Sequence, residues 1–256
     1  MKVAITGATG FLGRYLVSYL LDNLYDVLII TRGEERAKEY LPAGVNVYVT
    51  DYSFESLCEG LKEVETIIHL AAQTMQRDSD PFRVSQFFAV NITMTENLLL
   101  AAKQVGVQKV CQMSSNSVYS SENKIPFNEK DNPIPATIYG VSKVYAEKLG
   151  EYFSYKSEVK VISLRLARLF GYGERSSVVF TKYMNLANDG KLLEVWGEGK
   201  TRIEYLYVKD AVVAIENAVR MDIPNGIYNV GVNRSYSVLE IAKSVNIITG
   251  NTDNLI

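Results

Sequence analysis

Short apolar segments alternate along the chain with longer stretches in which apolar residues recur every three to four positions. The first pattern is typical of buried strands, and the second is typical of amphipathic helices that cover a sheet. Strands are predicted at residues 2–6, 26–31, 45–49, 66–70, 108–113 and 159–165. Helices are predicted at residues 11–22, 53–60, 82–105, 136–155, 176–189, 208–220 and 237–248. This alternation predicts an α/β fold with a doubly wound parallel sheet of the Rossmann type.

A glycine-rich turn separates the first predicted strand from the first predicted helix. Residues 7–13 (GATGFLG) have the spacing GxxGxxG. Gly7 permits a tight turn, Gly10 lets the backbone approach phosphates, and Gly13 lets the helix pack close to the strand. The N–H groups and positive dipole end of that helix favour a pyrophosphate. The alternative is an ordinary strand–helix turn, but the flanking strand and amphipathic helix favour a dinucleotide site.

Tyr139 and Lys143 are four positions apart in a predicted helix, so their side chains lie on one face. A tyrosine ordinarily titrates near ~10 and is a poor base at neutral pH. A nearby ammonium and an oxidised nicotinamide both favour the phenolate, and lowering its pKa by roughly 3 units takes about 4 kcal/mol. The pair therefore predicts a general base. Because the chain has 17 tyrosines, a chance pair on a solvated helix is the alternative.

The strand predicted at residues 108–113 runs into a segment rich in hydroxyl side chains. Ligands of open parallel sheets bind at the carboxyl ends of the strands. Ser115 is therefore expected to hydrogen-bond a substrate oxygen beside Tyr139. An ordinary serine-rich turn is the alternative.

The composition is that of a globular protein without a strongly charged surface. The 256 residues are 47% hydrophobic and 22% charged, and the net charge of -2 excludes a basic field for nucleic acid or anionic membranes. No apolar run reaches the ~20 residues that span a bilayer, and Met1 leads straight into a strand. We therefore expect neither a membrane segment nor a signal peptide, and a cytoplasmic location. Cys58 and Cys111 are expected to be free thiols, and the single histidine, His69, argues against a catalytic metal.

Taken in order along the chain, these motifs resemble the extended short-chain dehydrogenases/reductases, the family of NAD(P)-dependent sugar-nucleotide epimerases, dehydratases and reductases. The resemblance covers nearly the whole chain. Its segments are the glycine motif, Asp51-Tyr52, residues 69–72 (HLAA), Asn91 with residues 97–99 (NLL), Ser114-Ser115, residues 139–143 (YGVSK), residues 165–173 (RLARLFGYG) and residues 202–210 (RIEYLYVKD). It implies a Rossmann-type fold and a cofactor that is NAD or NADP.

The resemblance also implies roles for individual positions. The implied catalytic residues are Ser115, Tyr139 and Lys143. The expected cofactor-binding residues are Gly7, Gly10, Phe11, Leu12, Gly13, Arg32, Asp51, Tyr52, Leu70, Ala71, Ala72, Asn91, Tyr139, Lys143 and Ala167. The expected substrate-binding residues are Ser115, Asn116, Arg168, Val195 and Arg202. His69 matches a structural histidine, so it is not expected to act as a base.

Some of these residues also have a plain structural interpretation. Asn91 would then be a helix-packing amide and Asp51 a turn-forming residue after a strand, although the surrounding motifs favour the functional role for both. Arg202 would be an edge-strand residue paired with Glu204 or Glu198.

The chain departs from the family pattern at three places. NAD-binding members carry an acid at the end of the second strand, where this chain has Thr31 and Arg32, and an arginine there suits the 2′-phosphate of NADP. The alternative for Arg32 is a solvated side chain in a charged loop. Dehydratases carry an Asp-Glu pair where this chain has Asn116 and Ser117, so water elimination is disfavoured. Arg168 stands where many epimerases have an asparagine.

The resemblance also implies a division into two domains and an enzymatic function. It implies a dinucleotide-binding domain at residues 1–170 and a substrate-binding lobe at residues 171–256, interleaved with the first and incomplete at its C-terminus. We predict an NAD(P)-dependent sugar-nucleotide epimerase of the 4-epimerase kind, acting as a homodimer on a nucleotide-linked sugar. One alternative is an NADPH-dependent keto-sugar-nucleotide reductase. A non-catalytic NADP-binding regulatory protein is another, and the intact set of Ser115, Tyr139 and Lys143 argues against it.

Overall fold

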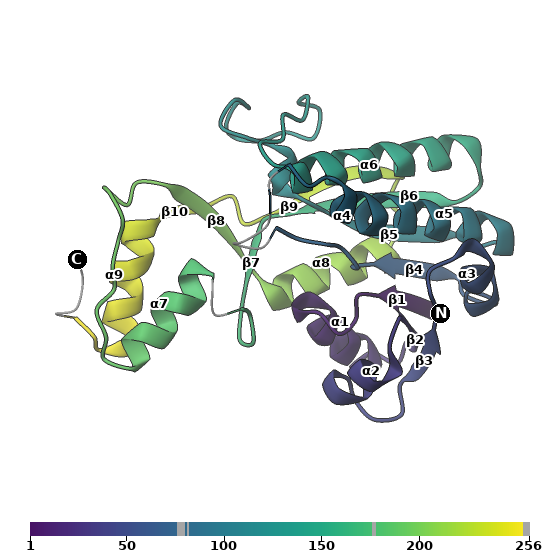
Figure 1. The fold of residues 1–256 in the computed structure, drawn as a ribbon, viewed down its shortest axis with the longest axis horizontal. Coiled ribbons are helices and arrows are strands. Elements are labelled where there is room, and N and C mark those ends of the chain that lie inside the picture. Colours follow the sequence, from purple (N-terminus) through teal and green to yellow (C-terminus); the bar gives the residue numbers. More distant parts are fainter. Residues whose placement is uncertain (76–79, 81, 176–177, 253–256) are drawn as a thin grey trace. The chain divides into compact units, whose positions relative to one another are not determined.

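The computed structural model describes residues 1–75, 80, 82–175 and 178–252. Within these residues, the larger sheet has seven parallel strands in the order β3-β2-β1-β4-β5-β6-β9 (Figure 1). Its strands are β1 (Lys2–Thr6), β2 (Asp26–Thr31), β3 (Asn46–Val49), β4 (Thr66–His69), β5 (Lys109–Ser115), β6 (Lys160–Leu166) and β9 (Gly226–Val230). The strand order reverses between β1 and β4, and open α/β sheets bind ligands at such a switch point. The predicted doubly wound fold is confirmed.

Helices cover both faces of this sheet, with α3, α5 and α6 on one face and α1, α2 and α8 on the other (Figure 1). The helices are α1 (Phe11–Asp22), α2 (Glu34–Tyr40), α3 (Phe54–Gly60), α4 (Ser85–Phe87), α5 (Met94–Val105), α6 (Ile138–Lys156) and α8 (Val208–Arg220). Central strand residues such as Ile29, Ile67 and Val110 are fully buried. A sheet covered on both faces explains why its strands are continuous apolar runs in the sequence. In the described part of the chain, no helix is both long and apolar enough to cross a membrane.

The elements differ from the prediction in a few places. The helix predicted at residues 82–105 is divided into α4, a π-helical segment at Phe88–Thr93, and α5. α2 is absent from the prediction because it buries only Ala37, which leaves no apolar stripe to detect. β9 is absent because its residues are all half-buried and do not alternate. The helix predicted at residues 176–189 begins at Val179 as α7, and residues 176–177 lie outside the described residues.

The chain forms two compact units that interleave in sequence. The first unit comprises Met1–Leu166 and Val212–Val230, and it contains the seven-stranded sheet. The second unit comprises Ala167–Ala211 and Gly231–Ile256.

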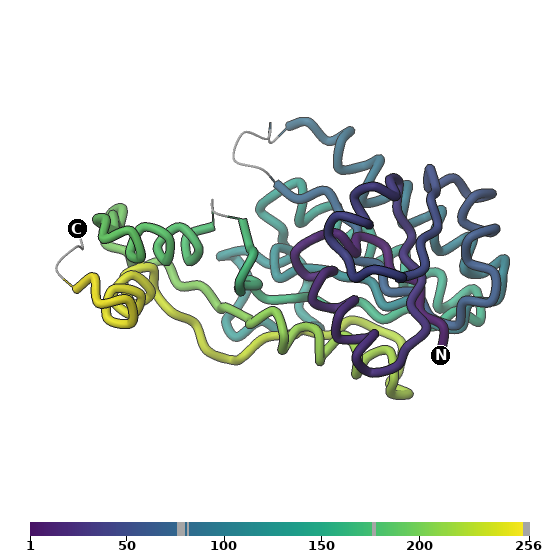
Figure 2. The backbone as a smooth tube through the Cα atoms, turned by 90° about the horizontal axis from the view of Figure 1, so that it is seen from below, coloured from purple at the N-terminus to yellow at the C-terminus, as the bar shows by residue number. Residues whose placement is uncertain are grey.

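The second unit has its own sheet and core. As far as the chain is described, this sheet has three strands in the order β10-β8-β7. The elements of the unit are β7 (Arg168–Phe170), α7 (Val179–Asn188), β8 (Arg202–Tyr207), β10 (Ser235–Ser237) and α9 (Val238–Thr249). The green helix α7 and the yellow helix α9 lie side by side in both views (Figure 2). Leu193, Tyr205 and Ala242 are among the buried side chains of its core.

Candidate active site

The glycine turn after β1 has the tight geometry that its spacing predicts. Gly7 adopts a left-handed backbone with φ of 71°. A Cβ atom at Gly7 would lie 2.6 Å from the Ala71 nitrogen, and one at Gly13 would lie 2.5 Å from the Gly7 carbonyl oxygen. Neither position has room for a side chain, because the turn packs against the segment after β4 and α1 packs against the turn.

The N-terminus of α1 is suited to an anion. Gly10 is its N-cap and donates its N–H to the Gly7 carbonyl oxygen at 3.0 Å. The N-cap residue is a glycine and makes no side-chain cap, and the first turn, which includes the half-buried Phe11 and Leu12, holds no acidic residue. The helix dipole and first-turn N–H groups are therefore not neutralised by a side chain of α1. These features fit a dinucleotide pyrophosphate at the switch point of the sheet.

Thr6 joins the glycine turn to the segment that follows β4. Its carbonyl oxygen accepts a hydrogen bond from the Leu70 N–H at 3.2 Å, and its hydroxyl accepts one from the Ala71 N–H at 3.2 Å. Leu70, Ala71 and Ala72 are all half-buried. The two strand ends that flank the switch point are thereby held together.

His69 is neutral, and both nitrogens of its ring are hydrogen-bonded. Its Nδ1 lies 2.7 Å from the Thr6 hydroxyl and its Nε2 lies 3.0 Å from the Thr95 hydroxyl. The Thr95 hydroxyl donates to the Asn91 carbonyl oxygen, so it accepts from Nε2–H, and Nδ1 accepts from Thr6. Burial lowers the pKa of His69 to about 3, and Lys143 acts in the same direction. With both nitrogens bonded, His69 serves structure, as the sequence indicates.

Asn91 lies in the π-helical segment, an irregularity often found at functional sites. Its carboxamide oxygen accepts from the Gln73 N–H at 2.7 Å. Its amide nitrogen donates to the Gln73 carbonyl oxygen and to the Ser142 hydroxyl, both at 2.9 Å. Asn91 therefore holds the backbone after β4 against the first turns of α6. These contacts are those of the packing amide considered for this position.

Lys143 is buried and is held between α6 and β5. Its Nζ donates to the Met113 carbonyl oxygen at 2.7 Å and lies 5.7 Å from the centre of the Tyr139 ring. Burial lowers the pKa of Lys143 to about 8, while the Glu147 carboxylate acts in the opposite direction. The residue is 7% exposed, so its charge acts where solvent screens little.

The start of α6 packs directly against the turn that follows β5. Thr137 caps α6 by accepting from the Gly140 N–H at 3.1 Å. A Cβ atom at Gly140 would clash with the Ser117 carbonyl oxygen, so glycine is what permits this approach. Ser115, at the end of β5, accepts from the Ser117 N–H at 3.1 Å. The fold therefore brings the strand that carries Ser115 to the helix that carries Tyr139 and Lys143.

The half-buried Asn116 and Ser117 form, with Val118, a short 3₁₀ turn next to Ser115. This is the position where a dehydratase would carry two acids. The Ser115 hydroxyl also bonds the Ser117 hydroxyl at 3.1 Å.

The residues expected to bind the adenosine end lie after β2 and β3. Tyr52 is buried, and its hydroxyl donates to the Ile30 carbonyl oxygen at 2.9 Å. Burial raises the pKa of Tyr52 to about 12, whereas Arg32 acts in the opposite direction. Arg32 is exposed. Asp51 is exposed and accepts from the Ser53 N–H at 2.9 Å, and bonding to Ser53 keeps the pKa of Asp51 below its usual value.

The remaining predicted residues belong to the second unit. Ala167 is buried, Arg168 is exposed at the start of β7, and Val195 packs on the core of that unit. Arg202 begins β8; its Nε donates to the Ser235 hydroxyl at 3.0 Å, and its Nη1 lies 3.3 Å from Glu240.

The structural alternative for Arg202 named the wrong acidic partners. Glu240 is the partner, because β10 pairs antiparallel with β8 and leads into α9. Glu204 instead accepts from the N–H groups of Val232 and Asn233. Glu198 pairs with Lys200.

Several residues that shape this site are missing from the sequence prediction. Thr6, Ser142, Glu147 and Arg165 make buried hydrogen bonds around the predicted residues. Ser142 and Arg165 stand inside the quoted motifs, and Glu147 follows Lys143 by one helical turn. Helical spacing alone offered a signal for Glu147, whereas nothing in the sequence pairs Thr6 with His69.

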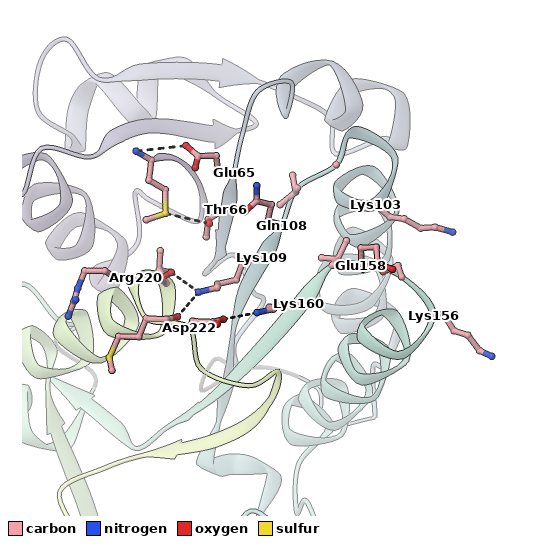
Figure 3. Close-up of a pocket in the computed structure, with 17 residues that line it drawn as sticks. Glu65, Thr66, Lys103, Gln108, Lys109, Lys156, Glu158, Lys160, Arg220 and Asp222 are labelled. Atoms are coloured by element: carbon pink, nitrogen blue, oxygen red, sulfur yellow. Dashed lines mark hydrogen bonds and ion pairs between the residues drawn. The ribbon is translucent and has the colours of Figure 1, made fainter.

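A cavity of about 700 Å³ lies near the amino ends of β4, β5 and β6, at the end of these strands that faces away from the candidate site (Figure 3). Two of the lysines that line it are bonded to groups of the protein itself. Lys109 Nζ donates to the carbonyl oxygens of Val219 and Met221 at the end of α8, and Lys160 pairs with Asp222 at 2.6 Å. Open parallel sheets bind ligands at the carboxyl ends of their strands. This cavity lies at the amino ends, so it is not the candidate site.

Comparison with known proteins identifies the family of this chain. The model of the NAD dependent epimerase/dehydratase family matches residues 3–231. The solved UDP-N-acetylglucosamine 4-epimerase from Bacillus cereus is 31% identical with a TM-score of 0.89, covering 100% of this chain and 84% of that chain. The UDP-glucuronic acid 4-epimerase from Bacillus cereus, solved in complex with UDP-glucuronic acid and NAD, is 25% identical with a TM-score of 0.87, covering 98% and 83%. The dTDP-D-glucose 4,6-dehydratase of Mus musculus is 26% identical, covering 95% of this chain and 72% of the mouse protein.

Proposed function

Because the chain belongs to the NAD dependent epimerase/dehydratase family, we propose that it catalyses the 4-epimerisation of a nucleotide-linked sugar. The observation that carries this proposal is the meeting of α6 with the end of β5, which sets Tyr139 and Lys143 beside the strand of Ser115. Two similar solved structures are 4-epimerases of UDP-sugars, and this supports the same reaction here.

The three side chains divide the proton chemistry between them. Tyr139 takes the proton of the sugar C4 hydroxyl as a general base and later returns it. Lys143 favours the Tyr139 phenolate through its buried charge. Ser115 hydrogen-bonds the same sugar oxygen and orients it. The nicotinamide, when bound, supplies a hydride acceptor and donor at that carbon.

Dehydration and net reduction have less support. A dehydratase needs an acid and a base after the serine, and the turn at Asn116–Val118 provides neither at Asn116 or Ser117. A reductase must exchange its cofactor in every turnover, whereas an epimerase regenerates it. The similar solved enzymes named above are epimerases, so we do not favour the reductase.

The cofactor is NAD or NADP, and the first unit supplies its site. We propose that the N-terminus of α1 binds the pyrophosphate, that Asp51 and Tyr52 flank the adenine, and that Lys143 also contacts the nicotinamide ribose. NAD is bound in the similar UDP-glucuronic acid 4-epimerase. Arg32, exposed at the end of β2, supports a preference for the 2′-phosphate of NADP. The ratio of the two affinities separates these possibilities.

We propose that Arg168 and Arg202 of the second unit bind the substrate in addition to Ser115 and Asn116. The Arg202 side chain is 55% exposed, although its guanidinium also contacts Ser235 and Glu240. A guanidinium has the geometry to bind the oxygens of a nucleotide diphosphate. Arg168 is also exposed and adds positive charge in the same unit. The bound UDP-glucuronic acid of the similar enzyme supports a UDP-sugar as the substrate class.

We also propose a homodimer formed through α6. Val141, Tyr145 and Tyr152 are exposed apolar side chains at helical spacing along one stripe of this helix. The exposed Phe88 ring lies 6.4 Å from the ring of Tyr145 and extends the stripe. Exposed aromatic stripes of this kind are typical of protein interfaces.

The free thiols of Cys58 and Cys111 fit the cytoplasmic location that we propose.

The identity of the dinucleotide released from freshly purified, denatured protein tests the proposal. An epimerase holds its cofactor through purification, so we expect NAD or NADP to be released in an amount close to that of the protein. A site that is emptied by purification, together with stoichiometric consumption of added NADPH by a keto-sugar nucleotide, would instead establish the reductase.

A further inference from the structure

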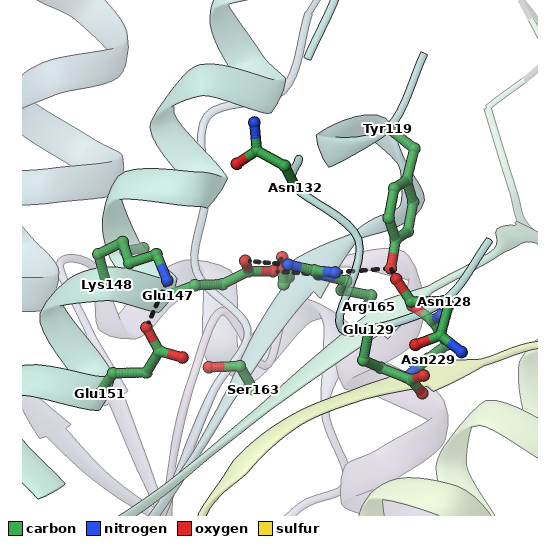
Figure 4. A network of polar contacts seen from close by, with 12 residues as sticks. Tyr119, Asn128, Glu129, Asn132, Glu147, Lys148, Glu151, Ser163, Arg165 and Asn229 are labelled. Carbon is green, nitrogen blue, oxygen red and sulfur yellow. Dashed lines mark hydrogen bonds and ion pairs between the residues drawn. The ribbon is translucent and has the colours of Figure 1, made fainter. Parts of the chain in front are cut away.

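Glu147 on α6 and Arg165 on β6 form a fully buried ion pair (Figure 4). Their side chains are 1% and 2% exposed. The Arg165 Nε donates to Glu147 Oε1 and its Nη2 donates to Oε2, each at 2.8 Å. Both oxygens of one carboxylate are thus held by one guanidinium in the bidentate geometry of the stronger ion pairs.

The pair extends into a network that reaches the connection between β5 and α6. Arg165 Nη1 donates to the Tyr119 hydroxyl at 2.6 Å. That hydroxyl is also bonded to the Asn128 carbonyl oxygen at 3.1 Å and to the Asn229 side chain on β9 at 3.0 Å. The Tyr119 ring stacks on Phe127 at 4.4 Å. The Arg165 guanidinium thus connects α6 and β6 to the segment that separates Ser115 from Tyr139, and the Tyr119 hydroxyl extends this connection to β9.

The same carboxylate fastens α6 to β5. Glu147 Oε1 accepts from the Ser114 hydroxyl at 2.5 Å. One helical turn earlier, Lys143 donates to the Met113 carbonyl oxygen at 2.7 Å. Consecutive residues of β5 thus contact consecutive turns of α6, and the next residue of β5 is Ser115. The position of Ser115 relative to Tyr139 depends on these two contacts.

We propose that Glu147 and Arg165 are positioning residues of the active site, which hold the helix of Tyr139 and Lys143 at a fixed distance from Ser115. The proposal rests on the proposed function, because it assigns the pair to the geometry of that reaction. Neither residue is assigned a contact with substrate or cofactor.

Glu147 also acts on the electrostatics of Lys143. Among the titratable groups of the described residues, those given an interaction with the Lys143 ammonium are Glu147 and Tyr139 on its own helix and His69 on β4. His69 is neutral, so Glu147 is the negative charge of this set, and it favours the ammonium over the amine. Loss of Glu147 would therefore weaken the cation that favours the Tyr139 phenolate.

A merely structural ion pair makes a different prediction. Buried ion pairs pay a large desolvation cost, and replacing both members together is often tolerated by the fold. If the pair only stabilises the fold, its replacement should lower the melting temperature without a specific effect on kcat. If the pair positions the active site, its replacement should lower kcat in protein that remains folded, because a misplacement of about 1 Å costs roughly 100-fold in rate.

The experiment compares four variants with the wild type. Glu147→Gln leaves the Arg165 charge buried without its counter-charge and is expected to lower the melting temperature. Glu147→Gln with Arg165→Gln removes both charges and keeps polar groups at both places. Glu147→Asp keeps the charge on a shorter side chain. Glu151→Gln is the matched control, since Glu151 forms an exposed pair with Lys148 on the same helix (Figure 4).

Four quantities are measured for each variant that melts cooperatively: kcat and KM with UDP-glucose and UDP-N-acetylglucosamine, the NAD affinity of cofactor-free protein, and the Tyr139 pKa. The pKa is read by NMR with isotope-labelled tyrosine, and the signal that Tyr139→Phe removes identifies the residue. We expect the double variant to lose about 100-fold in kcat, with KM and NAD affinity little changed and the Tyr139 pKa raised. Glu147→Asp should recover part of the rate, and Glu151→Gln should match the wild type.

A folded double variant with wild-type kcat and a wild-type Tyr139 pKa would overturn the positioning role. A wild type that converts neither sugar would instead count against the proposed function. The Tyr139 pKa would still test the positioning role in that case, since its measurement needs no substrate.

Discussion

The Lys143 ammonium lies 5.7 Å from the centre of the Tyr139 ring while it donates a hydrogen bond to the Met113 carbonyl oxygen of β5. Because the strand fixes the ammonium and the helix fixes the ring, the distance between charge and phenol is set by the fold. Both residues lie on the early turns of α6, where Gly140 lets the helix approach the turn after Ser115. The proton chemistry that we propose is a property of this one helix–strand junction.

Tyr139→Phe is expected to reduce kcat by about 100- to 10,000-fold, the usual contribution of a general base. The substitution removes only the ionisable oxygen, so NAD affinity and the melting temperature should stay close to those of the wild type. Steady-state kinetics and a cofactor titration on the same preparation check this. Turnover near the wild-type level would remove Tyr139 from the mechanism.

The activity should fall as the pH rises through about 8, the pKa to which burial lowers Lys143. The protonated lysine is the form that favours the phenolate, so the group contributes below this pH and is lost above it. The pH profile of kcat/KM reports the groups of the free enzyme. Lys143→Arg keeps a permanent charge, so its profile should lack this alkaline decline. A decline of the same shape in that variant would assign it to another group.

Gly140→Ala is expected to destabilise the protein by about 1–3 kcal/mol, the usual cost of an overpacked site. The added Cβ would clash with the Ser117 carbonyl oxygen and push α6 away from β5. We expect kcat to fall more than KM rises, because the change separates Tyr139 from Ser115. Gly33→Ala is the control, since a Cβ there meets nothing within 4 Å. Equal melting temperatures and rates for both variants would contradict the close approach.

Arg32→Ala should weaken NADP binding by about 1–3 kcal/mol if a charge-assisted contact with the 2′-phosphate is lost. NAD has no phosphate there, so its affinity should change little. Titrations of cofactor-free protein with both dinucleotides measure the difference. Arg36→Ala, at an exposed position on α2, is the matched control. Equal losses for NAD and NADP would show that Arg32 is only a solvated surface residue.

The sequence predicts the local features of this fold but not those that depend on contacts between residues far apart in the chain. The glycine turn and the spacing of Tyr139 and Lys143 are contained in short segments, so periodicity and turn chemistry suffice to predict them. The bond between Tyr119 and Asn229 joins residues 110 positions apart, which no local pattern reveals. Arg202 shows the same limit, because its partner Glu240 becomes a neighbour only when β10 pairs with β8.

The ion pair of Glu147 and Arg165 was missed for a related reason. A glutamate and an arginine in a helix and a strand are ordinarily solvated residues, and only the packing of α6 on the sheet buries them. α2 was missed because a helix with one buried residue carries no apolar stripe.

The most direct test of the account is to incubate the purified protein, with no added reductant, with UDP-glucose and separately with UDP-N-acetylglucosamine, and to follow the sugar by NMR. We predict that at least one is converted to a mixture with its C4 epimer and that no dinucleotide is consumed. The same mixture should form when the reaction starts from the epimer, and Tyr139→Phe should form none. No conversion of any nucleotide sugar by protein loaded with NAD or NADP, or conversion only with stoichiometric oxidation of NADPH, would contradict the account.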